Sequence, residues 1–338
     1  MLRIATYNVE WFNALFDDAG ALLADGGWSG RQNVRRGEQL AALGQVFGAL
    51  DADAVMVIEA PDDNRKRSTV QALEAFAHHF GLRARKALLG FRNNTQQEIA
   101  LLYNPDVFTA AHDPQGKEGA AHAPRFDGTF RHDLDSDATP DPVTFSKPPL
   151  EAVLTLRENG AALRLIGVHI KSKAPIGARD ADQVMRLAIE NRRKQLAQCI
   201  WLRQRVEAHL AQGENLIVLG DFNDGPGLDE YEKLFGRSGL EIVLGEGDGT
   251  KLFDPHARAA LIGRGAVPTT ARFYIHPERR YLEALLDYIM LSPSLMSKRP
   301  KWRIWHPFSD RDCYECPDLR EALLTASDHF PVSVDLDL

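Results

Sequence analysis

The sequence predicts an α/β fold in which short buried strands alternate with amphipathic helices. The strands are indicated by short apolar runs that close on a polar residue or a glycine, such as 54–58 and 216–219. The helices are indicated by apolar residues three and four positions apart, as in 40–50 and in the long segment 182–210. Because both patterns recur in turn along the chain, they indicate the α/β class.

The elements can be assigned in order. Strands are predicted at 2–8, 54–58, 99–103, 152–156, 163–168, 216–219 and 332–336, with a further one at 282–291 that Asp287 interrupts. Helices are predicted at 40–50, 68–80 and 182–210, with a short one at 229–235; Ser68 with Gln71 is typical of a capping box. Asn159-Gly160 suits a tight hairpin turn because both residues tolerate positive φ. We expect glycine-rich loops before 282 and loop excursions at 110–149 and 298–326.

Length, composition and charge limit the class of protein. The chain has 338 residues, within reach of one large α/β unit, so we expect a single domain over 1–338. With 44% hydrophobic and 26% charged residues, the composition is that of a globular protein with ample material for a core. The net charge of −7 disfavours binding long nucleic acid by phosphate neutralisation alone. A divalent cation would still let such a chain accept a phosphate substrate.

Cysteine usage and the N-terminus favour a cytoplasmic location. The three cysteines are odd in number and suggest no disulfide framework. No apolar run is long enough for a membrane span, and the first residues resemble a strand rather than a secretion signal. Cys313 and Cys316 could join His306 and Asp312 at a zinc ion, but a structural zinc site usually takes four ligands, so free thiols are the simpler interpretation.

Polar side chains gather where the predicted strands end. Each alone is most simply a solvated, capping or core residue, but together they indicate a site, because ligands collect at strand ends in open α/β sheets. Carboxylate oxygens suit Mg²⁺ or Mn²⁺, whereas imidazoles and an amide suit phosphoryl oxygens. The set comprises Asn8, Glu10, Glu59, His169, Asp221, Asn223, Asp287, Asp328 and His329.

The stretch 216–226, LIVLGDFNDGP, is the central one of these strand ends. A buried strand runs into a loop there, so Asp221 and Asn223 can both point into one cleft. An Asx-rich turn, in which both side chains only cap the local backbone, explains this stretch alone equally well. The other strand-end residues favour the site.

Six blocks of sequence together resemble the endonuclease/exonuclease/phosphatase superfamily in content and order. This superfamily includes pancreatic-type deoxyribonucleases, exonuclease III-like repair nucleases, inositol polyphosphate 5-phosphatases and neutral sphingomyelinases. The resemblance spans nearly the whole chain and is most specific in GDFN and SDH. The blocks are TYNVEW (6–11), VIEA (57–60), GVHIKSK (167–173), LGDFND (219–224), LDYIML (286–291) and SDHFPV (327–332).

The resemblance implies a four-layer α/β sandwich, two central mixed sheets flanked by helices, with the active site at one edge. It also implies a metal site in which Glu59 is the principal ligand, with Asn8, Glu10 and Asp328 around the same or a second metal position. The metal would be Mg²⁺ or Mn²⁺, with Ca²⁺ as a further candidate.

The same resemblance assigns catalytic roles. Asp221 would orient and deprotonate the attacking water, and Asn223 would hold the scissile phosphate. Asp287 would orient the imidazole of His329 and favour its charged form. His169 matches a second histidine of the deoxyribonuclease and sphingomyelinase branches that exonuclease III-like enzymes lack.

The predicted function is metal-dependent phosphodiester hydrolysis, with DNA, RNA or a nucleotide-like diester as substrate. HIKSK at 169–173 is similar to the HxKSK segments of bacterial nuclease-like members; Lys171 and Lys173 would neutralise neighbouring phosphates, and Arg92 and Asn94 would line the cleft. The alternatives are a phosphomonoesterase or a sphingomyelinase-like lipid phosphodiesterase with the same centre, and, less favoured, a non-catalytic binding module. We expect neither membrane insertion nor an obligate protein partner.

Overall fold

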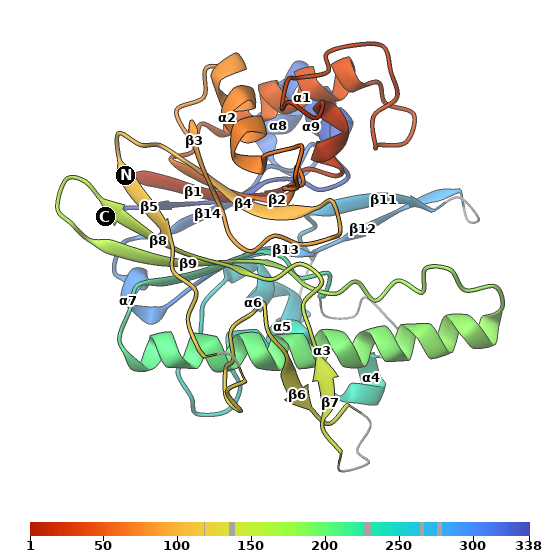
Figure 1. Cartoon of the computed structure of the whole chain (residues 1–338), viewed down its shortest axis with the longest axis vertical. Helices are drawn as coiled ribbons and strands as arrows, with labels where there is room; N and C mark the ends of the chain where they lie inside the picture. The colour runs from red at the N-terminus through yellow and green to blue at the C-terminus, as the bar shows by residue number, and fades with distance from the viewer. Residues whose placement is uncertain (118, 135–138, 226–231, 264–266, 276–278) are drawn as a thin grey trace.

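The fold consists of two mixed β-sheets packed face to face, with helices on both outer faces (Figure 1). The structure, a computed structural model, describes residues 1–117, 119–134, 139–225, 232–263, 267–275 and 279–338. The α/β sandwich implied by the resemblance is confirmed.

The first sheet has six strands, and its centre brings two site segments together. β1 runs parallel to β2, and the other neighbours pair antiparallel. Asn8, the last residue of β1, pairs with Ile58, so Glu59 follows at the same edge. The strand order is β14 (Lys301–Ile304), β15 (Val332–Leu336), β1 (Leu2–Asn8), β2 (Ala54–Ala60), β4 (Glu98–Tyr103) and β3 (Lys86–Leu89).

The second sheet has five strands and carries the remaining catalytic candidates. β10 pairs parallel with β9 and antiparallel with β13. In this register Asp221 lies between His169 on one side and Asp287 on the other. The order is β13 (Asp287–Leu291), β10 (Leu216–Asp221), β9 (Ala162–His169), β8 (Leu150–Leu156) and β5 (Phe108–His112).

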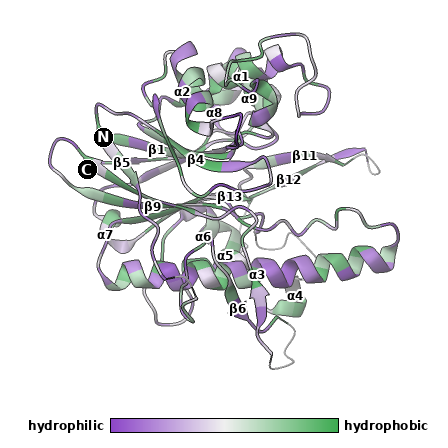
Figure 2. Cartoon of the chain, viewed as in Figure 1, coloured by the Kyte–Doolittle hydropathy of each residue, from purple (hydrophilic) through white to green (hydrophobic). Residues whose placement is uncertain are grey.

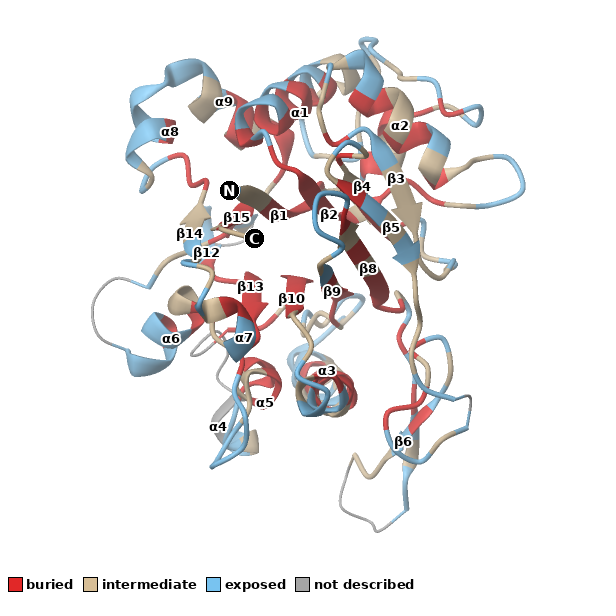
Figure 3. Ribbon diagram, turned by 90° about the vertical axis from the view of Figure 1, so that its left-hand side faces the viewer, coloured by how far each residue is buried: buried red, intermediate tan, exposed pale blue. Residues whose placement is uncertain are grey.

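Three apolar clusters hold the layers together. The inner faces of the two sheets share one cluster, which includes Met56, Leu165 and Leu219. A second fills the space between the six-stranded sheet and α1 (Arg36–Leu50), α2 (Thr69–His79) and α9 (Pro317–Ala326). The third lies between the five-stranded sheet and α3 (Ala181–Ala211) and α5 (Gly239–Leu244). Figure 3 shows the burial concentrated in the sheets and the helix faces that cover them.

The N-terminal part of α3 extends beyond the sheets, on the side where β1, β9 and β10 end (Figure 1). Figure 2 shows hydrophilic and hydrophobic residues mixed along this projecting part, where Val184 and Met185 are exposed. It joins β9 through residues 170–180. Thus α3 both covers the five-stranded sheet and reaches past its functional edge. In the described part of the chain, every helix is too short or too polar to cross a membrane.

The strands predicted at 2–8 and 332–336 match β1 and β15, and the other assigned strands are confirmed within a few residues. The helices predicted at 40–50, 68–80 and 182–210 correspond to α1, α2 and α3, and Ser68 caps α2 by accepting from the Gln71 N–H. Of the short helix predicted at 229–235, residues 229–231 lie outside the described part, and α4 (Glu232–Phe235) follows.

Other regions differ from the prediction. The expected loops before 282 contain α5, α6 (Pro255–Ile262) and β11 (Ala271–Ile275), and the strand predicted at 282–291 is two strands, β12 (Arg280–Ala284) and β13. Leu285 and Leu286 separate them, so Asp287 begins a strand rather than interrupting one. The segment 298–326, expected as a loop excursion, contains β14, α8 (Arg311–Glu315) and α9; α7 (Pro293–Met296) precedes it. All of these elements except α9 span only four to eight residues, too few to show a clear period, whereas α9 has apolar residues at helical spacing that the prediction did not use.

The excursion at 110–149 packs against α3. It carries β6 (Phe130–His132) and β7 (Asp141–Val143), which pair as a small separate sheet. Phe126, Phe130 and Phe145 surround the fully buried Trp201 of α3, with ring centroids 5.0 to 5.6 Å from it. This aromatic cluster anchors the excursion to α3, and the chain continues from Phe145 to Lys147.

Gly220 permits the close approach of β9 and β10 just before Asp221. Its φ of +135° lies where side chains are strained, and a Cβ there would collide with the carbonyl oxygen of Val168. The glycine of the GDFN block therefore sets the position of the aspartate that follows it.

Candidate active site

Asp221 occupies the centre of the site. Its Oδ2 accepts a hydrogen bond from Asn8 Nδ2 at 3.0 Å and lies 3.6 Å from His169 Nε2 and 4.0 Å from His329 Nε2. Its Oδ1 accepts from the Asn223 N–H at 2.8 Å. Burial raises the pKa of Asp221 to about 7. Such a carboxylate can take up a proton near neutral pH.

Asp287 and His329 form a hydrogen-bonded pair beside Asp221. His329 Nδ1 lies 2.7 Å from Asp287 Oδ2, which leaves Nε2 directed toward Asp221. Burial lowers the pKa of His329, but the carboxylates of Asp287 and Asp221 outweigh it and hold this pKa well above the usual range. The ring is therefore an imidazolium at neutral pH.

Thr270 holds Asp287 in place. Its hydroxyl donates to Asp287 Oδ2 at 2.8 Å and accepts from the backbone N–H groups of Leu286 and Asp287 at 3.0 and 2.9 Å. Thr270 is fully buried, so these bonds are shielded from water. Asp287 thus has one oxygen fixed by two donors.

His169 is neutral and has a cation beside it. Burial and the charges of Lys147 and His329 hold its pKa well below the usual range. Lys147 Nζ lies 3.2 Å from His169 Nδ1 and 3.4 Å from Nε2. Burial lowers the pKa of Lys147, while the charges of Glu59 and Asp221 oppose that shift. The lysine therefore faces the same space as both carboxylates.

Glu59 lies on a β-bulge at the end of β2. The register between β2 and β4 shifts at this residue, whose φ is +62°. Its Oε2 accepts from the Trp11 N–H at 3.0 Å and from Gln97 Nε2 at 2.7 Å. Within the described part of the chain, Oε1 receives no hydrogen bond and is not buried from solvent. This oxygen is open to a ligand.

Glu10 and Asp328 form a second acidic group behind Asn8. The Oε2 of Glu10 accepts from the Asp328 N–H at 3.0 Å and pairs with the guanidinium of Arg31. Burial, together with the charge of Asp328, raises the pKa of Glu10 to about 7. Asn8 Oδ1 accepts from the Glu10 N–H at 3.1 Å, which links this group to Asp221.

Four non-glycine residues of the site adopt left-handed backbone conformations. They are Glu10, Trp11, Glu59 and Asn223, with φ between +43° and +62°. Such conformations cost on the order of 1–3 kcal/mol each and persist where surrounding contacts hold them. Hydrogen bonds to Asp221 and Glu59 do so here.

The four residues predicted to bind substrate differ in their exposure and in their partners. Lys171 is partly exposed, and Lys173 Nζ makes an ion pair with the buried Asp224 at 2.7 Å. Arg92 and Asn94 are exposed in the loop before β4, and the Arg92 guanidinium pairs with Asp63 at 2.7 Å. Lys173 and Arg92 thus have anionic partners within the protein.

A buried polar face of α3 holds three site loops. Gln195 Nε2 donates to the carbonyls of Lys171 and Asn223 at 3.1 and 2.9 Å. Gln198 Nε2 donates to the Thr144 carbonyl, and its Oε1 accepts from the Lys171 N–H, both at 2.9 Å. The segments that carry Lys147, His169 and Asn223 are thereby fixed to one helix.

Sequence reasoning missed Lys147, Thr270, Arg31 and the polar positions of α3. Lys147 lies in a segment without periodicity, and Gln195 and Gln198 resemble ordinary helix-surface residues until their burial is known. The Thr270 and Arg31 contacts join segments far apart in the chain.

In the described residues, one group of three side chains could hold a metal ion by distance alone. The ligand atoms of Asp221, Asp287 and His329 lie within 4.8 Å of one another. His329 Nδ1 and Asp287 Oδ2 are already bonded to each other there, however, so this pair is less available to a metal ion. Glu59, with its open oxygen, is the better anchor for a cation.

Cys313 is buried and Cys316 exposed, and both are free thiols.

Fold and site together define a phosphoester-hydrolysing enzyme. A model of the endonuclease/exonuclease/phosphatase family matches residues 5–329, so the chain belongs to this family and is an enzyme of the phosphoric ester hydrolase class. The family is divalent-metal dependent. No curated protein matches the chain significantly.

Solved structures share the fold at low sequence identity. A family protein from Bacteroides thetaiotaomicron has a TM-score of 0.51 and 18% identity, with 98% of this chain and 96% of that chain covered. The 3′ phosphatase NExo from Neisseria, bound to a product DNA hairpin, has a TM-score of 0.51 and 16% identity, with both chains covered completely. Truncated TDP2 from Caenorhabditis elegans has a TM-score of 0.50 and 15% identity, over 98% of this chain and 96% of that chain.

Replacing Asp224 tests the frame that holds the loops. Asp224 is fully buried, and its carboxylate pairs with Arg192 at 2.7 Å and accepts from the Gly239 N–H at 2.6 Å. Asp224→Ala leaves the guanidinium in the interior without this partner and should lower the free energy of unfolding by about 3–5 kcal/mol in urea titrations. Glu315→Ala, which removes the exposed pair with Arg311, is the control and should have little effect. Equal, small losses in both variants would contradict a structural role for Asp224.

Replacing Thr270 tests the support of Asp287. Thr270→Val removes one donor from Asp287 and leaves two buried N–H groups unpaired, so it should lower the free energy of unfolding by about 1–3 kcal/mol and also lower kcat/KM. Thr270→Ser keeps the hydroxyl and should stay close to wild type in both measurements. A serine variant as impaired as the valine variant would show that the hydroxyl alone does not support Asp287.

Proposed function

We propose that the chain hydrolyses phosphodiesters of DNA, RNA or a nucleotide-like compound by in-line attack of a water that Asp221 deprotonates. The convergence of one buried carboxylate with two imidazoles carries this proposal: Asp221 Oδ2 lies 3.6 Å from His169 Nε2 and 4.0 Å from His329 Nε2. Phosphoryl transfer needs a positioned nucleophile, neutralised oxygens and help for the departing oxygen.

The proposal assigns side chains to each of these three requirements of phosphoryl transfer. Asp221 takes the proton of the water, because its pKa of about 7 suits a base at neutral pH. The charged groups of His329 and Lys147 neutralise the phosphoryl oxygens. The neutral ring of His169 donates a hydrogen bond toward the departing oxygen. The amide of Asn223, which bonds to the Ile170 carbonyl and to Asp221 Oδ2 in this structure, holds the phosphate when the substrate is bound.

The residues present fit a divalent cation. Glu59 would hold it with the open oxygen of its carboxylate, and Asn8 would contribute its amide oxygen beside it. Glu10 and Asp328 add negative charge around this position, although Glu10 already pairs with Arg31. Mg²⁺ or Mn²⁺, with Ca²⁺ as a further candidate, would supply charge neutralisation at the phosphate.

A phosphomonoesterase with the same centre is the second candidate. Two cationic side chains, Lys147 and His329, face the place of the phosphate, which also suits the dianion of a monoester. The solved structure of the 3′ phosphatase NExo is consistent with such chemistry on this fold. Turnover of p-nitrophenyl phosphate without turnover of bis-p-nitrophenyl phosphate would reverse the order of the two candidates.

The free thiols are compatible with action in the cytoplasm, which we retain as part of the proposal.

Asp221→Asn should abolish hydrolysis of bis-p-nitrophenyl phosphate while the variant remains folded by circular dichroism. The amide cannot accept the proton of the water. Lys147→Gln should lower kcat/KM on the order of tenfold to a thousandfold, and Lys147→Arg should retain part of it, because the arginine keeps the charge. Near-wild-type turnover by Asp221→Asn with metal present would refute the assignment.

Metal removal provides an independent test. Excess EDTA should stop turnover, and Mg²⁺ or Mn²⁺ should restore it, because the proposed site needs a cation to neutralise the phosphate. Glu59→Gln should raise the metal concentration required for half-maximal activity. Full activity in EDTA would count against the metal site.

The pH profile should have its acidic limb near neutrality. Asp221 must be unprotonated to act as base, and burial raises its pKa to about 7, so kcat/KM should fall as pH drops below that value. The high pKa of His329 keeps that ring charged at the same pH, so it does not produce the acidic limb. A profile that stays level down to pH 5 would contradict the role of Asp221.

A further inference from the structure

The β11–β12 hairpin projects from the molecule on the side where β1, β9 and β10 end (Figure 1). Its base is bonded to the segment that carries the histidine of the site. Ala271 forms a β-bridge with His329, the Arg272 N–H donates to the Asp328 carbonyl at 2.7 Å, and the Phe330 N–H donates to the Thr270 carbonyl at 2.6 Å. The position of the hairpin is therefore fixed relative to His329.

One face of the hairpin continues directly from the active site. In the register of the two strands, Phe273 pairs with Leu282 and Ile275 with Arg280, and side chains two positions apart share a face. The Phe273 ring contacts the His329 ring edge to face, with centroids 5.6 Å apart. The face formed by Phe273, Ile275, Arg280 and Leu282, here called the arm face, thus begins at the catalytic histidine.

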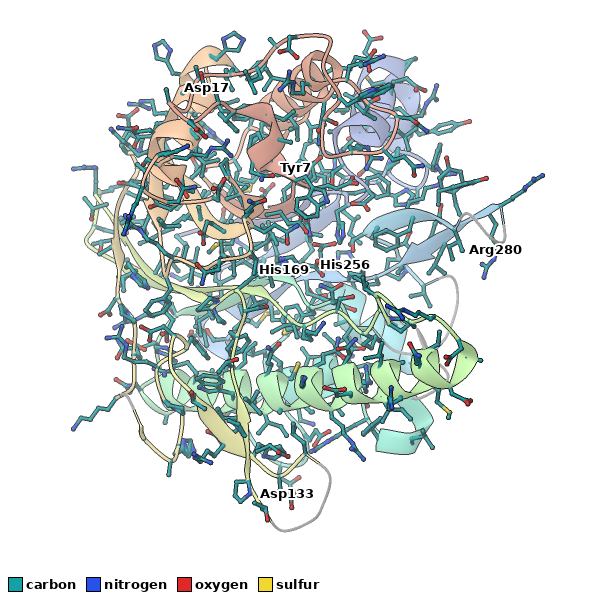
Figure 4. The ribbon with its side chains drawn as sticks, turned by 45° about the vertical axis from the view of Figure 1, so that its right-hand side comes forward. Tyr7, Asp17, Asp133, His169, His256 and Arg280 are labelled. Carbon is teal, nitrogen blue, oxygen red and sulfur yellow. The ribbon has the colours of Figure 1, made fainter. Side chains whose placement is uncertain are left out.

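The arm face is apolar near the site and basic at its outer end. Leu282 is 37% exposed, whereas Phe273 and Ile275 are half-buried. Arg280 is exposed, and Figure 4 shows it at the outer end of the hairpin, with His169 near the middle of the molecule. Among the described residues, the apolar cluster to which Phe273 belongs contains only members from 271–286. No other described element therefore contributes to this cluster.

The opposite face of the hairpin is aromatic and basic as well. Tyr274 and Tyr281 are 44% and 51% exposed, with ring centroids 5.2 Å apart. The Arg272 guanidinium lies 3.5 Å from the centroid of the Tyr281 ring. A two-stranded hairpin by itself is marginally stable in water, so a ligand that packs on it would add to its stability.

Exposed aromatic rings interleaved with arginines are typical of surfaces that bind single-stranded nucleic acid. Bases stack on the rings, and guanidinium groups take the phosphates. Within a duplex the bases are already stacked on one another, and the net charge of −7 disfavours binding of long duplexes by charge alone. A lipid surface fits poorly, because three arginines and two glutamates interrupt the apolar residues over 271–284.

Distance along the hairpin fits this occupant. Phe273 lies two residues from the bridge to His329, and Leu282 is its cross-strand partner. At about 3.3 Å per residue this is roughly 7 Å, so a base close to the scissile phosphate can reach this ring. Arg280 lies about two residues farther out, where the next phosphates of such a strand would be.

We propose that the hairpin is a strand-binding arm: bases beside the scissile phosphate of a single-stranded nucleic acid stack on Phe273 and Leu282, and Arg280 binds a phosphate farther along. This proposal rests on the proposed function, because it identifies the substrate of the same site as a nucleic-acid strand. A small diester, which lacks neighbouring bases, does not use the arm.

The test compares two substrates for each variant. We would measure kcat/KM for a single-stranded 12-nucleotide DNA and for bis-p-nitrophenyl phosphate, and use the ratio of the two. Phe273→Leu keeps apolar packing against His329 but removes the aromatic face, and should lower the ratio about tenfold, within the range of base–aromatic stacking. Phe273→Tyr, which keeps an aromatic ring, should have the same ratio as wild type. Arg280→Ala, at the far end of the arm face, should lower the ratio several-fold.

Tyr314→Ala is the matched control, because Tyr314 is 53% exposed on α8 and contacts Arg320 rather than the hairpin. Its ratio should equal that of wild type. A direct measurement uses Asp221→Asn, in which cleavage is removed: labelled 12-nucleotide DNA should bind about tenfold more weakly when Phe273→Leu is added.

The possible outcomes separate the two proposals. If neither substrate is hydrolysed by wild type, the proposed function fails, while binding of the labelled DNA still tests the arm. If both substrates are hydrolysed and neither Phe273→Leu nor Arg280→Ala changes the ratio or the affinity, the arm proposal is overturned. Tighter binding to a double-stranded DNA of the same length, dependent on Phe273, would also overturn it.

Discussion

The burial of one carboxylate, Asp221, is the constraint on which the site depends. A buried carboxylate is costly unless it is hydrogen-bonded and has charges beside it. Asn8 and Asn223 supply the hydrogen bonds and His329 the charge. These partners come from both sheets and from the segment between α9 and β15, so the carboxylate links the two halves of the fold at their common edge. The same burial gives Asp221 a pKa suited to a base at neutral pH.

The polar face of α3 is the second structural requirement. A helix that only covered a sheet would present apolar residues to it, but here Arg192, Gln195 and Gln198 are buried. Each bonds to the site loops or to the residue after Asn223. Buried polar groups that are fully bonded can fix one arrangement of the loops that they join. Burying Arg192 costs free energy, but its bonds help to fix the geometry of the site.

The hairpin formed by β11 and β12 connects catalysis to recognition. Thr270 at its base bonds to Asp287, and Phe273 packs on His329. A strand held by the arm face would thus be aligned by the same element that orients the imidazole. When one element positions both the substrate and a catalytic group, the reacting atoms are aligned without a conformational change.

The sequence by itself determined the strands and long helices, since hydrophobic periodicity depends only on which side of each element is buried. It also predicted Asp221, Asn223, His169, Asp287 and His329 as catalytic candidates, because acidic, amide and imidazole side chains follow buried strands at recognisable blocks. The position of Lys147 lay beyond the sequence, since its segment has no period and is held by contacts with α3. Likewise, the pairing of Thr270 with Asp287, the ion pair that occupies Lys173 and the arm face beside His329 were decided only by the tertiary structure. The physical reason is the same in each case: these contacts join segments that are distant or irregular in sequence, and only the packing of the two sheets and their covering elements brings them together.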